Sequence, residues 1–265
     1  MKNLKKIIAL VLCLALAFAL AACGKTDKED DGKLKTAEAG KLIMATNATF
    51  PPYEYYEGKD VVGIDADVAA LIAEKLGLKL EIQDVEFDSI IPGVQQGKYD
   101  IGMAGITVNE DRQRKVNFSD PYATGVQVVI VKEGSAIKSI DDLSEKTKIG
   151  VQQGTVGDTY ASDTPENGGY GEDAVVRYSS GALAVEGLKA GKVDCVIIDN
   201  EPAKAYVAAN EGLKILDGTW VEENYAICFA KENTTLQTAV NNALKELIAD
   251  GSVQKVVDKY IKADK

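Results

Sequence analysis

The 265-residue chain contains no histidine, and it has only three arginines, four cysteines and one tryptophan. The absence of histidine excludes a Ser-His-Asp catalytic triad and zinc sites with histidine ligands, because both need the imidazole ring. Few arginines and a formal net charge of -11 argue against nucleic-acid binding, which depends on clustered Lys and Arg. We expect no cofactor, no metal ion and no nucleic-acid partner.

The composition favours a folded globular protein. Hydrophobic residues make up 46% of the chain and charged residues 27%, which is typical of a protein with a buried core and not of a disordered, collagenous or coiled-coil chain. A chain of this length forms one large domain or two modest ones.

The N-terminal segment has the pattern of a secretion signal. Three lysines precede an apolar run over residues 7–19, which is too short to span a bilayer comfortably, and small residues follow. The sequence LAAC at residues 20–23 resembles a bacterial lipobox, which implies cleavage of residues 1–22 and lipidation of Cys23. An uncleaved anchor and ordinary secretion are the alternatives. Residues 23–40, rich in charge and poor in large apolar residues, are predicted to be a flexible tether.

Strands alternate with helices along the rest of the chain. The strand KLIMAT is followed by an amphipathic helix that Asp65 or Asp67 is expected to cap and that Gly77 stops, and then by the strand LKLEIQDV. This order predicts βαβ units and mostly parallel sheets.

An internal repeat indicates two similar lobes. The run IIPGVQQGKYDIGMAGI and the run AVEGLKAGKVDCVIIDN carry glycines, a lysine and an aspartate in register, with Asp100 and Asp194 separated by 94 positions. Each run reads as a helix, a Gly-Lys turn and a strand. A single copy could be an ordinary turn after a helix, but the pair favours two α/β lobes.

The chain is predicted to cross between the lobes twice, near residues 120–126 and 221–225. Lobe 1 would comprise residues 41–122 and 224–265, and lobe 2 residues 123–223, with hinge segments at its ends. The two crossing strands would form a hinge with a cleft between the lobes. Cys195 and Cys228 lie in apolar runs of different lobes, which favours buried free thiols over a disulfide.

Ligands of α/β sheets bind outside the carboxyl ends of strands, so the loops there are the candidate site. AGITVNEDR in one of these loops contains Arg112, whose planar fork can pair with a carboxylate through two hydrogen bonds. Thr107 and Glu110 are predicted to form a capping box that places Arg112 in the first turn of a helix at the cleft. The alternative is a surface arginine beside Asp111.

Five collinear segments carry a resemblance to a known family. They are MATNATFPPYEY, VGIDADVAALIAEKLG, VEFDSIIPGVQQGKYDIGMAGITVNEDRQRKVNFSDPY, IGVQQGTVGDTYA and GKVDCVIIDNEPA. Together they resemble solute-binding family 3, the polar amino-acid binding proteins of bacterial ABC importers. The resemblance implies a periplasmic-binding-protein fold whose two lobes close on a free amino acid.

The resemblance also implies a role for each site residue. Arg112 would bind the ligand carboxylate with the backbone of Thr107 and of Thr155 or Val156. Asp199, from the opposite lobe, would accept the ligand ammonium together with the Gly105 carbonyl and the Thr107 hydroxyl. The residues expected around the ligand side chain are Asn47, Phe50, Phe87, Ala104 and Gln152.

Three alternatives apply to single residues. Asp199 could only cap the helix that starts near Glu201, Thr155 could only be an N-cap after a glycine, and Phe50 and Phe87 could be ordinary core residues.

The nature of the ligand depends on Asn47, where many relatives carry aspartate. An amide lacks the charge that would offset a buried ligand cation, so a neutral polar ligand such as glutamine or cystine is predicted. Glu54 could restore a charge if it points inward.

The implied protein is not an enzyme but a monomeric lipoprotein. It would be anchored outside the cytoplasm to the bacterial cell membrane through Cys23, and it would deliver its ligand to a membrane permease. The alternatives are an amino-acid-sensing surface lipoprotein and an enzyme resembling cyclohexadienyl dehydratase, with Asp199 or Glu201 as acid or base.

Overall fold

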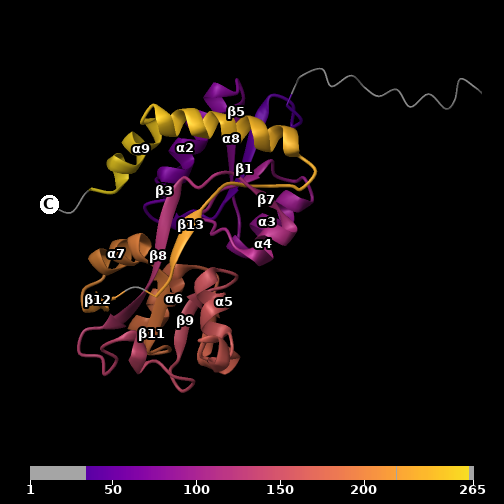
Figure 1. The fold of residues 1–265 in the computed structure, drawn as a ribbon. Coiled ribbons are helices and arrows are strands. Elements are labelled where there is room, and N and C mark those ends of the chain that lie inside the picture. Colours follow the sequence, from indigo (N-terminus) through magenta and orange to yellow (C-terminus); the bar gives the residue numbers. More distant parts are fainter. Residues whose placement is uncertain (1–33, 219, 263–265) are drawn as a thin grey trace, which may run out of the picture. The chain divides into compact units, whose positions relative to one another are not determined.

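The computed structural model describes residues 34–218 and 220–262. The predicted signal peptide, the lipidated Cys23 and most of the predicted tether lie outside the described residues. Within those ranges the predicted fold class is confirmed, with two α/β lobes that each contain a twisted sheet (Figure 1). No helix of the described part is both long and apolar enough to cross a membrane.

Lobe 1 is built on a five-stranded sheet. Its strands in spatial order are β5 (Lys79–Asp84), β1 (Lys41–Thr46), β6 (Ile101–Gly102), β14 (Cys228–Phe229) and β7 (Asn117–Phe118). Strand β1 runs parallel to β5 and β6, whereas β14 runs antiparallel to β6 and β7. A small second sheet contains β2 (Thr49–Phe50), β3 (Glu54–Glu57) and β4 (Asp60–Val62). The helices of the lobe are α2 (Ile64–Lys75), α3 (Phe87–Gln95), α4 (Glu110–Lys115), α8 (Thr234–Ala249) and α9 (Ser252–Tyr260).

Lobe 2 repeats this plan. Its strands in spatial order are β10 (Val175–Tyr178), β9 (Ile149–Gln152), β11 (Cys195–Asp199), β8 (Ala123–Lys132) and β12 (Leu213–Ile215). Its helices are α5 (Val156–Ser162), α6 (Gly181–Lys189) and α7 (Asn200–Ala209), with short 3-10 turns at Ile140–Asp142, Pro165–Asn167 and Glu172–Ala174. As in lobe 1, three neighbouring strands run parallel, here β10, β9 and β11, and their carboxyl ends lie at one edge. Strand β8 runs antiparallel to β11 and β12.

Two antiparallel strands join the lobes. Strand β13 (Glu222–Tyr225) pairs with the start of β8, from Glu222 opposite Val126 to Tyr225 opposite Ala123, and the two strands run side by side in Figure 1. Gly125 of β8 is required here, because a Cβ atom at this position would overlap the Tyr225 ring. The predicted boundaries between the lobes, after residues 122 and 223, lie at the start of β8 and inside β13.

The aspartate of the repeated Gly-Lys-x-Asp turn has the same structural role in both lobes. Asp100 accepts a hydrogen bond of 2.7 Å from the N–H of Ile43 at the start of β1. Asp194 accepts one of 2.8 Å from the N–H of Lys148, just before β9. Each aspartate therefore ties the turn to the neighbouring strand, and these side chains are part of the scaffold. Asp100 has one more partner, the N–H of Ala37 at 2.6 Å, so the end of the predicted tether contacts lobe 1.

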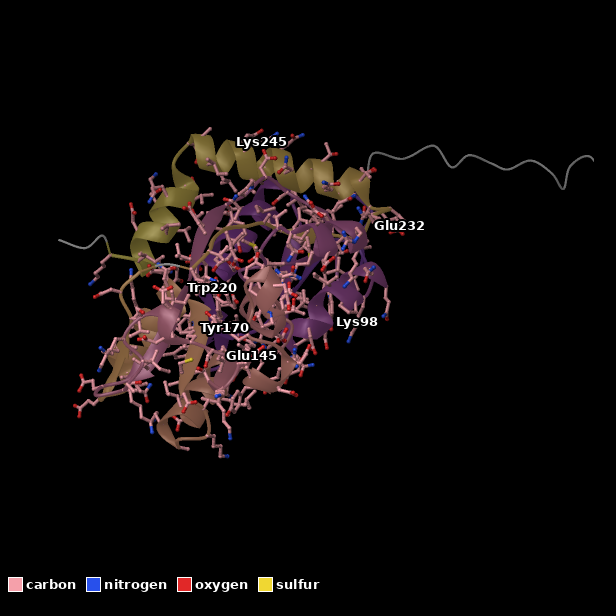
Figure 2. All side chains as sticks on the ribbon, turned by 60° about the horizontal axis from the view of Figure 1, so that its bottom comes forward. Lys98, Glu145, Tyr170, Trp220, Glu232 and Lys245 are labelled. Carbon is pink, nitrogen blue, oxygen red and sulfur yellow. The ribbon has the colours of Figure 1, made fainter. Side chains whose placement is uncertain are left out.

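Each lobe also has its own apolar core. Cys228 lies in the core of lobe 1 and Cys195 in that of lobe 2, and both thiols are free and buried, as predicted. The single tryptophan, Trp220, closes the edge of the second core. Its ring centroid lies 5.9 Å from that of Tyr170 and 6.0 Å from that of Tyr160, and Figure 2 labels the first of these pairs.

Two predicted helix caps are wrong. Helix α2 starts after Gly63, which has a positive φ, and the Asp65 carboxylate instead accepts the N–H of Gly105 at 2.9 Å. Helix α4 starts after Asn109, whose side chain accepts the N–H of Arg112 at 2.9 Å. In both cases a partner distant in the sequence, which spacing alone does not reveal, takes the side chain that was expected to cap.

Candidate functional site

One cavity between the lobes is lined by every residue that the sequence suggests for ligand binding. Its free volume is about 20 Å³, room for roughly one water molecule, so the cavity is nearly closed in this structure. Glu54 is the one further residue that lines it. The full lining is Asn47, Phe50, Glu54, Phe87, Ala104, Gly105, Thr107, Arg112, Gln152, Thr155, Val156 and Asp199.

Arg112 is a buried cation and not a surface arginine. Its side chain is held by two carbonyl groups, that of Thr107 in lobe 1 at 2.8 Å from Nη1 and that of Gly154 in lobe 2 at 3.2 Å from Nη2. The guanidinium also lies 5.4 Å from the centre of the Phe87 ring. Burial lowers the pKa of Arg112, although the group stays charged at neutral pH. The guanidinium is therefore oriented before any ligand contact is made.

Asp199 ends β11 and stands at the N-cap position of α7. Its side chain makes no capping bond and instead accepts a hydrogen bond from the hydroxyl of Tyr225 on β13. Burial raises the pKa of Asp199, while hydrogen bonds from Tyr225 and Gln127 and the charge of Arg112 act in the opposite sense. A simple helix cap does not explain this arrangement, because the carboxylate is turned towards the hinge strand and the cavity.

Thr107 and Gly105 lie on the loop that follows β6. The Thr107 hydroxyl donates a hydrogen bond of 3.0 Å to Glu223 and takes no part in the predicted capping box. Gly105 has φ +54, and a Cβ atom there would come within 2.9 Å of the Phe50 ring. The loop can therefore pass this close to the aromatic wall only with glycine at this position.

Asn47 and Gln152 join the two lobes at the cavity. The Gln152 amide donates to the Asn47 carbonyl oxygen at 2.9 Å and to the Ser179 backbone at 3.3 Å. The Asn47 amide in turn donates to the Val85 backbone at 2.8 Å. Both the amide and the carbonyl oxygen of Asn47 therefore already form hydrogen bonds within the protein.

The start of α5 is fixed by an ion pair that the sequence does not reveal. Thr155 is the N-cap of this helix and accepts the N–H of Asp158, as its place after a glycine suggests. The Asp158 carboxylate accepts the N–H of Gly154 at 2.9 Å and the Nε of Arg177 at 2.8 and 2.9 Å. One of the three arginines of the chain thus holds the loop that carries Thr155.

Glu54 adds a second carboxyl group to the cavity. It is almost fully buried at 1% exposure, and both burial and the neighbouring Asp65 raise its pKa well above the usual value. Burial raises the pKa of Asp65 to about 6, while hydrogen bonds from Gly105, Glu54 and Tyr122 oppose that rise. Both acids therefore hold their protons to a higher pH than usual, and Glu54 Oε2 and Asp65 Oδ1 are buried without a hydrogen-bond partner among the described residues.

Aromatic rings form one wall of the cavity region. The Phe50 ring stacks on Tyr53 with 5.8 Å between centroids, and Tyr53 meets Tyr225 edge-on at 5.2 Å. Phe50 is buried and Phe87 is partly buried, and both line the cavity. In the described part of the chain, no group of three or more acidic or cysteine side chains is placed to hold a metal ion.

The similarity to known proteins extends over most of the chain. A family model described as "Bacterial extracellular solute-binding proteins, family 3" matches residues 42–263. The arginine-binding extracellular protein ArtP of Bacillus subtilis (strain 168) is 32% identical over 99% of this chain and 100% of its own length.

Two solved structures of an ancestral arginine-binding protein are also similar. The arginine-bound form is 39% identical with a TM-score of 0.77, covering 84% of this chain and 98% of that one. The glutamine-bound form is 38% identical with a TM-score of 0.78, covering 85% and 100%. All three relatives are named as binding proteins and not as enzymes, in agreement with the prediction.

Proposed function

We propose, since the chain belongs to family 3 of the bacterial extracellular solute-binding proteins, that it captures a free amino acid between its lobes for an ABC importer. One observation carries this proposal. A single cavity contains a buried guanidinium from lobe 1, on Arg112, and a buried carboxylate from lobe 2, on Asp199. A zwitterion presents one anion and one cation a few ångströms apart, and this pair is complementary to both.

Arg112 would bind the ligand carboxylate, with backbone N–H groups of Thr107 and of Thr155 or Val156 beside it. Asp199 would accept the ligand ammonium together with the Gly105 carbonyl and the Thr107 hydroxyl. Each hydrogen bond to a charged group contributes about 1.5–3 kcal/mol net. The summed free energy of several such bonds exceeds the free-energy cost of the freedom lost on association. Micromolar affinity or better is expected.

Lobe closure would bring the two charges to the same ligand. Support comes from bonds that already cross the cleft, from Gln152 to Asn47 and from Arg112 to the Gly154 carbonyl. Gln153 also donates to Asp88 across the rim at 2.7 Å. These contacts would break on opening and reform when the lobes close on a ligand.

The ligand side chain is proposed to lie near Phe50 and Phe87 and to reach the Glu54 carboxyl group. This changes the preference suggested by Asn47, because Glu54 lines the cavity and supplies the carboxylate that Asn47 lacks. An arginine side chain would favour ionised Glu54 over the protonated form and pair with its charge. A glutamine side chain would instead accept a hydrogen bond from the protonated Glu54.

We therefore propose L-arginine as the ligand, with L-glutamine as the main competitor. ArtP is named as an arginine-binding protein, which supports arginine. The ancestral protein was solved with arginine and with glutamine, which supports binding of both ligands by one fold. Cystine, which the sequence also suggests, would have to fit a second charged amino-acid end near Glu54.

The experiment is calorimetric titration of the mature protein with L-arginine, L-glutamine and L-cystine. Glu54→Gln keeps the shape of the side chain and removes the charge, so arginine should bind about 100-fold more weakly or worse, as expected for a buried cation left unpaired. Glutamine affinity should change little. Glu57→Gln on the exposed end of the same strand is the matched control. If arginine binds equally well to the Glu54→Gln variant, the side-chain assignment is wrong, and if no amino acid binds, the proposed function fails.

The cellular part of the proposal is a monomeric lipoprotein, held on the outer side of the cell membrane through Cys23 and delivering its ligand to a membrane permease. The LAAC sequence supports the anchor. Radiolabelled palmitate should label the wild-type protein in cells, whereas Cys23→Ser should be unlabelled and should escape into the soluble extracytoplasmic fraction. Labelling of Cys23→Ser would contradict the anchor, and sedimentation of the mature protein tests the monomer.

A further inference from the structure

Glu223 is a buried carboxylate in the hinge strand β13. Its side chain is 5% exposed, and its backbone pairs with Gly125 of the other hinge strand. One carboxylate oxygen, Oε2, accepts hydrogen bonds from the Thr107 hydroxyl at 3.0 Å and from the Gln127 amide at 3.2 Å. The other, Oε1, is buried without a hydrogen-bond partner among the described residues. Glu223 does not line the cavity, but its partner Thr107 does.

The charged and titratable groups around Glu223 come from both lobes. They are Arg112 of lobe 1, Asp199 and Tyr160 of lobe 2, and Tyr225 of its own strand. Burial and the charge of Asp199 raise the pKa of Glu223 to about 7, while Thr107, Gln127 and Arg112 act in the opposite sense. The charges of Asp199 and Arg112 already shift the pKa of Glu223, so the charge of a ligand bound between them should shift it as well.

The bond to Glu223 determines what Thr107 can offer a ligand. A threonine hydroxyl has one hydrogen and two lone pairs. Once the hydrogen is donated to Glu223, the oxygen can only accept a hydrogen bond from the cavity side. That is the polarity an ammonium group needs, and a carboxylate in the same place would be repelled.

We propose that Glu223 is a positioning residue for amino-acid binding, because it takes the Thr107 hydrogen and so fixes the Thr107 oxygen as an acceptor for the ligand ammonium. This inference rests on the proposed function. It adds a carboxylate, outside the cavity, that orients the zwitterion through Thr107 and links its capture to the hinge strand β13.

Ligand binding should then be coupled to proton release. The ligand ammonium stabilises ionised Glu223, so the pKa of this group is lower in the complex than in the free protein. Affinity should therefore rise with pH through the free-protein pKa and level off above it. A tenfold rise in the acid dissociation constant of Glu223 on binding, starting from a pKa of about 7, gives roughly fivefold weaker binding at pH 6 than at pH 8 and releases about 0.4 protons at pH 7.

The test uses the mature protein with L-arginine and L-glutamine as probes. Titration at pH 7 in buffers of different ionisation enthalpy gives the number of protons released on binding, and titration from pH 6 to 8 gives the affinity profile. Glu223→Gln keeps the side-chain shape and, with L-glutamine as the probe, should lose this proton release and flatten the profile. With L-arginine it should lose only the part of the proton release that ionisation of Glu54 does not supply. Glu222→Gln, exposed on the same strand, is the matched control and should behave like wild type.

A double-mutant cycle separates positioning from a general structural effect. If Glu223 acts through the Thr107 hydroxyl, Glu223→Leu, which cannot accept the Thr107 hydrogen, should weaken binding several-fold in the wild-type background but have little effect in a Thr107→Val background. Thr107→Ser, which keeps the hydroxyl, should restore the effect. Additive losses in the cycle would overturn the positioning role.

Each outcome bears on a defined claim. If wild type binds a probe with the same proton release and pH profile as Glu223→Gln, the inference fails and the proposed function stands. If wild type binds neither probe at any pH from 6 to 8, the proposed function fails and the inference fails with it.

Discussion

Replacing Asp199 by asparagine separates the function of the cavity from the stability of the fold. The amide has nearly the shape of the carboxylate and can still accept a hydrogen bond from Tyr225, but it carries no charge. Without Asp199, the ligand ammonium would be buried opposite neutral acceptors only. Breaking such a buried pair costs about 3–5 kcal/mol, so ligand affinity should fall by roughly 150-fold to several thousand-fold.

The stability of the free protein should change in the opposite sense. Burial raises the pKa of Asp199 above its ordinary value near 3.9. The folded state therefore binds this proton more tightly than the unfolded state does, and stability is lost as pH rises through the folded-state pKa. The asparagine side chain does not titrate, so Asp199→Asn should melt at the same or a higher temperature than wild type at neutral pH, and its advantage should disappear near pH 3.

Calorimetric titration with L-arginine and L-glutamine, together with thermal melts of the free protein from pH 3 to 8, measures both effects. Asp217→Asn, an exposed aspartate of the same lobe, serves as the control and should change neither. The reasoning is refuted if Asp199→Asn binds the same ligand within tenfold of wild type. A melting temperature well below that of wild type at neutral pH would instead show that the carboxylate is needed for folding.

Three further substitutions probe the parts that hold the cavity together. Asn47→Ala removes the bond that Gln152 makes across the lobes and should weaken ligand binding about tenfold by titration, whereas unchanged affinity would show that this contact does not support closure. Gly125→Ala should displace the Tyr225 ring and lower the free energy of unfolding by about 1–3 kcal/mol in a denaturant melt; an unchanged midpoint would contradict the tight hinge packing. Arg177→Ala removes the ion pair at the start of α5 and should lower the unfolding free energy by about 1–2 kcal/mol, with weaker binding and no change in ligand preference; a changed preference would place Arg177 in direct ligand contact.

The sequence predicts the residues of the cavity well because strand order constrains them. Loops at the carboxyl ends of parallel strands meet at one edge of a sheet, so Thr107 after β6 and Gln152 at the end of β9 could be assigned to a cleft before any coordinates. The repeat around Asp100 and Asp194 likewise predicts two lobes, because both aspartates satisfy the same backbone requirement. The roles of Thr107 and Gln152 in ligand binding stay predictions.

The hydrogen-bond partners within the site could not be predicted in the same way. Thr107 and Glu110 have the spacing of a capping box, but the hydroxyl of Thr107 binds Glu223, which is 116 positions away. The Thr107 hydroxyl could bond either locally at the start of α4 or to the distant carboxylate of Glu223. It bonds to Glu223, because an unpaired buried carboxylate oxygen would cost more free energy than the loss of a Thr107 cap, which Asn109 replaces. Sequence spacing contains no information about such distant competitors.

The two lobes share a scaffold but not a site, and the proposed binding of a zwitterion rests on this difference. Asp100 and Asp194 repeat, whereas the cation Arg112 belongs to lobe 1 alone and the anion Asp199 to lobe 2 alone. Each charge already has protein partners, carbonyl groups for the guanidinium and the Tyr225 hydroxyl for the carboxylate. On the proposed function, a ligand would gain both contacts without the entropy loss of ordering either side chain. The lobe that the ligand meets first would supply one end of this recognition and closure the other, so selectivity for an α-amino acid and closure of the lobes would depend on the same pair of charges.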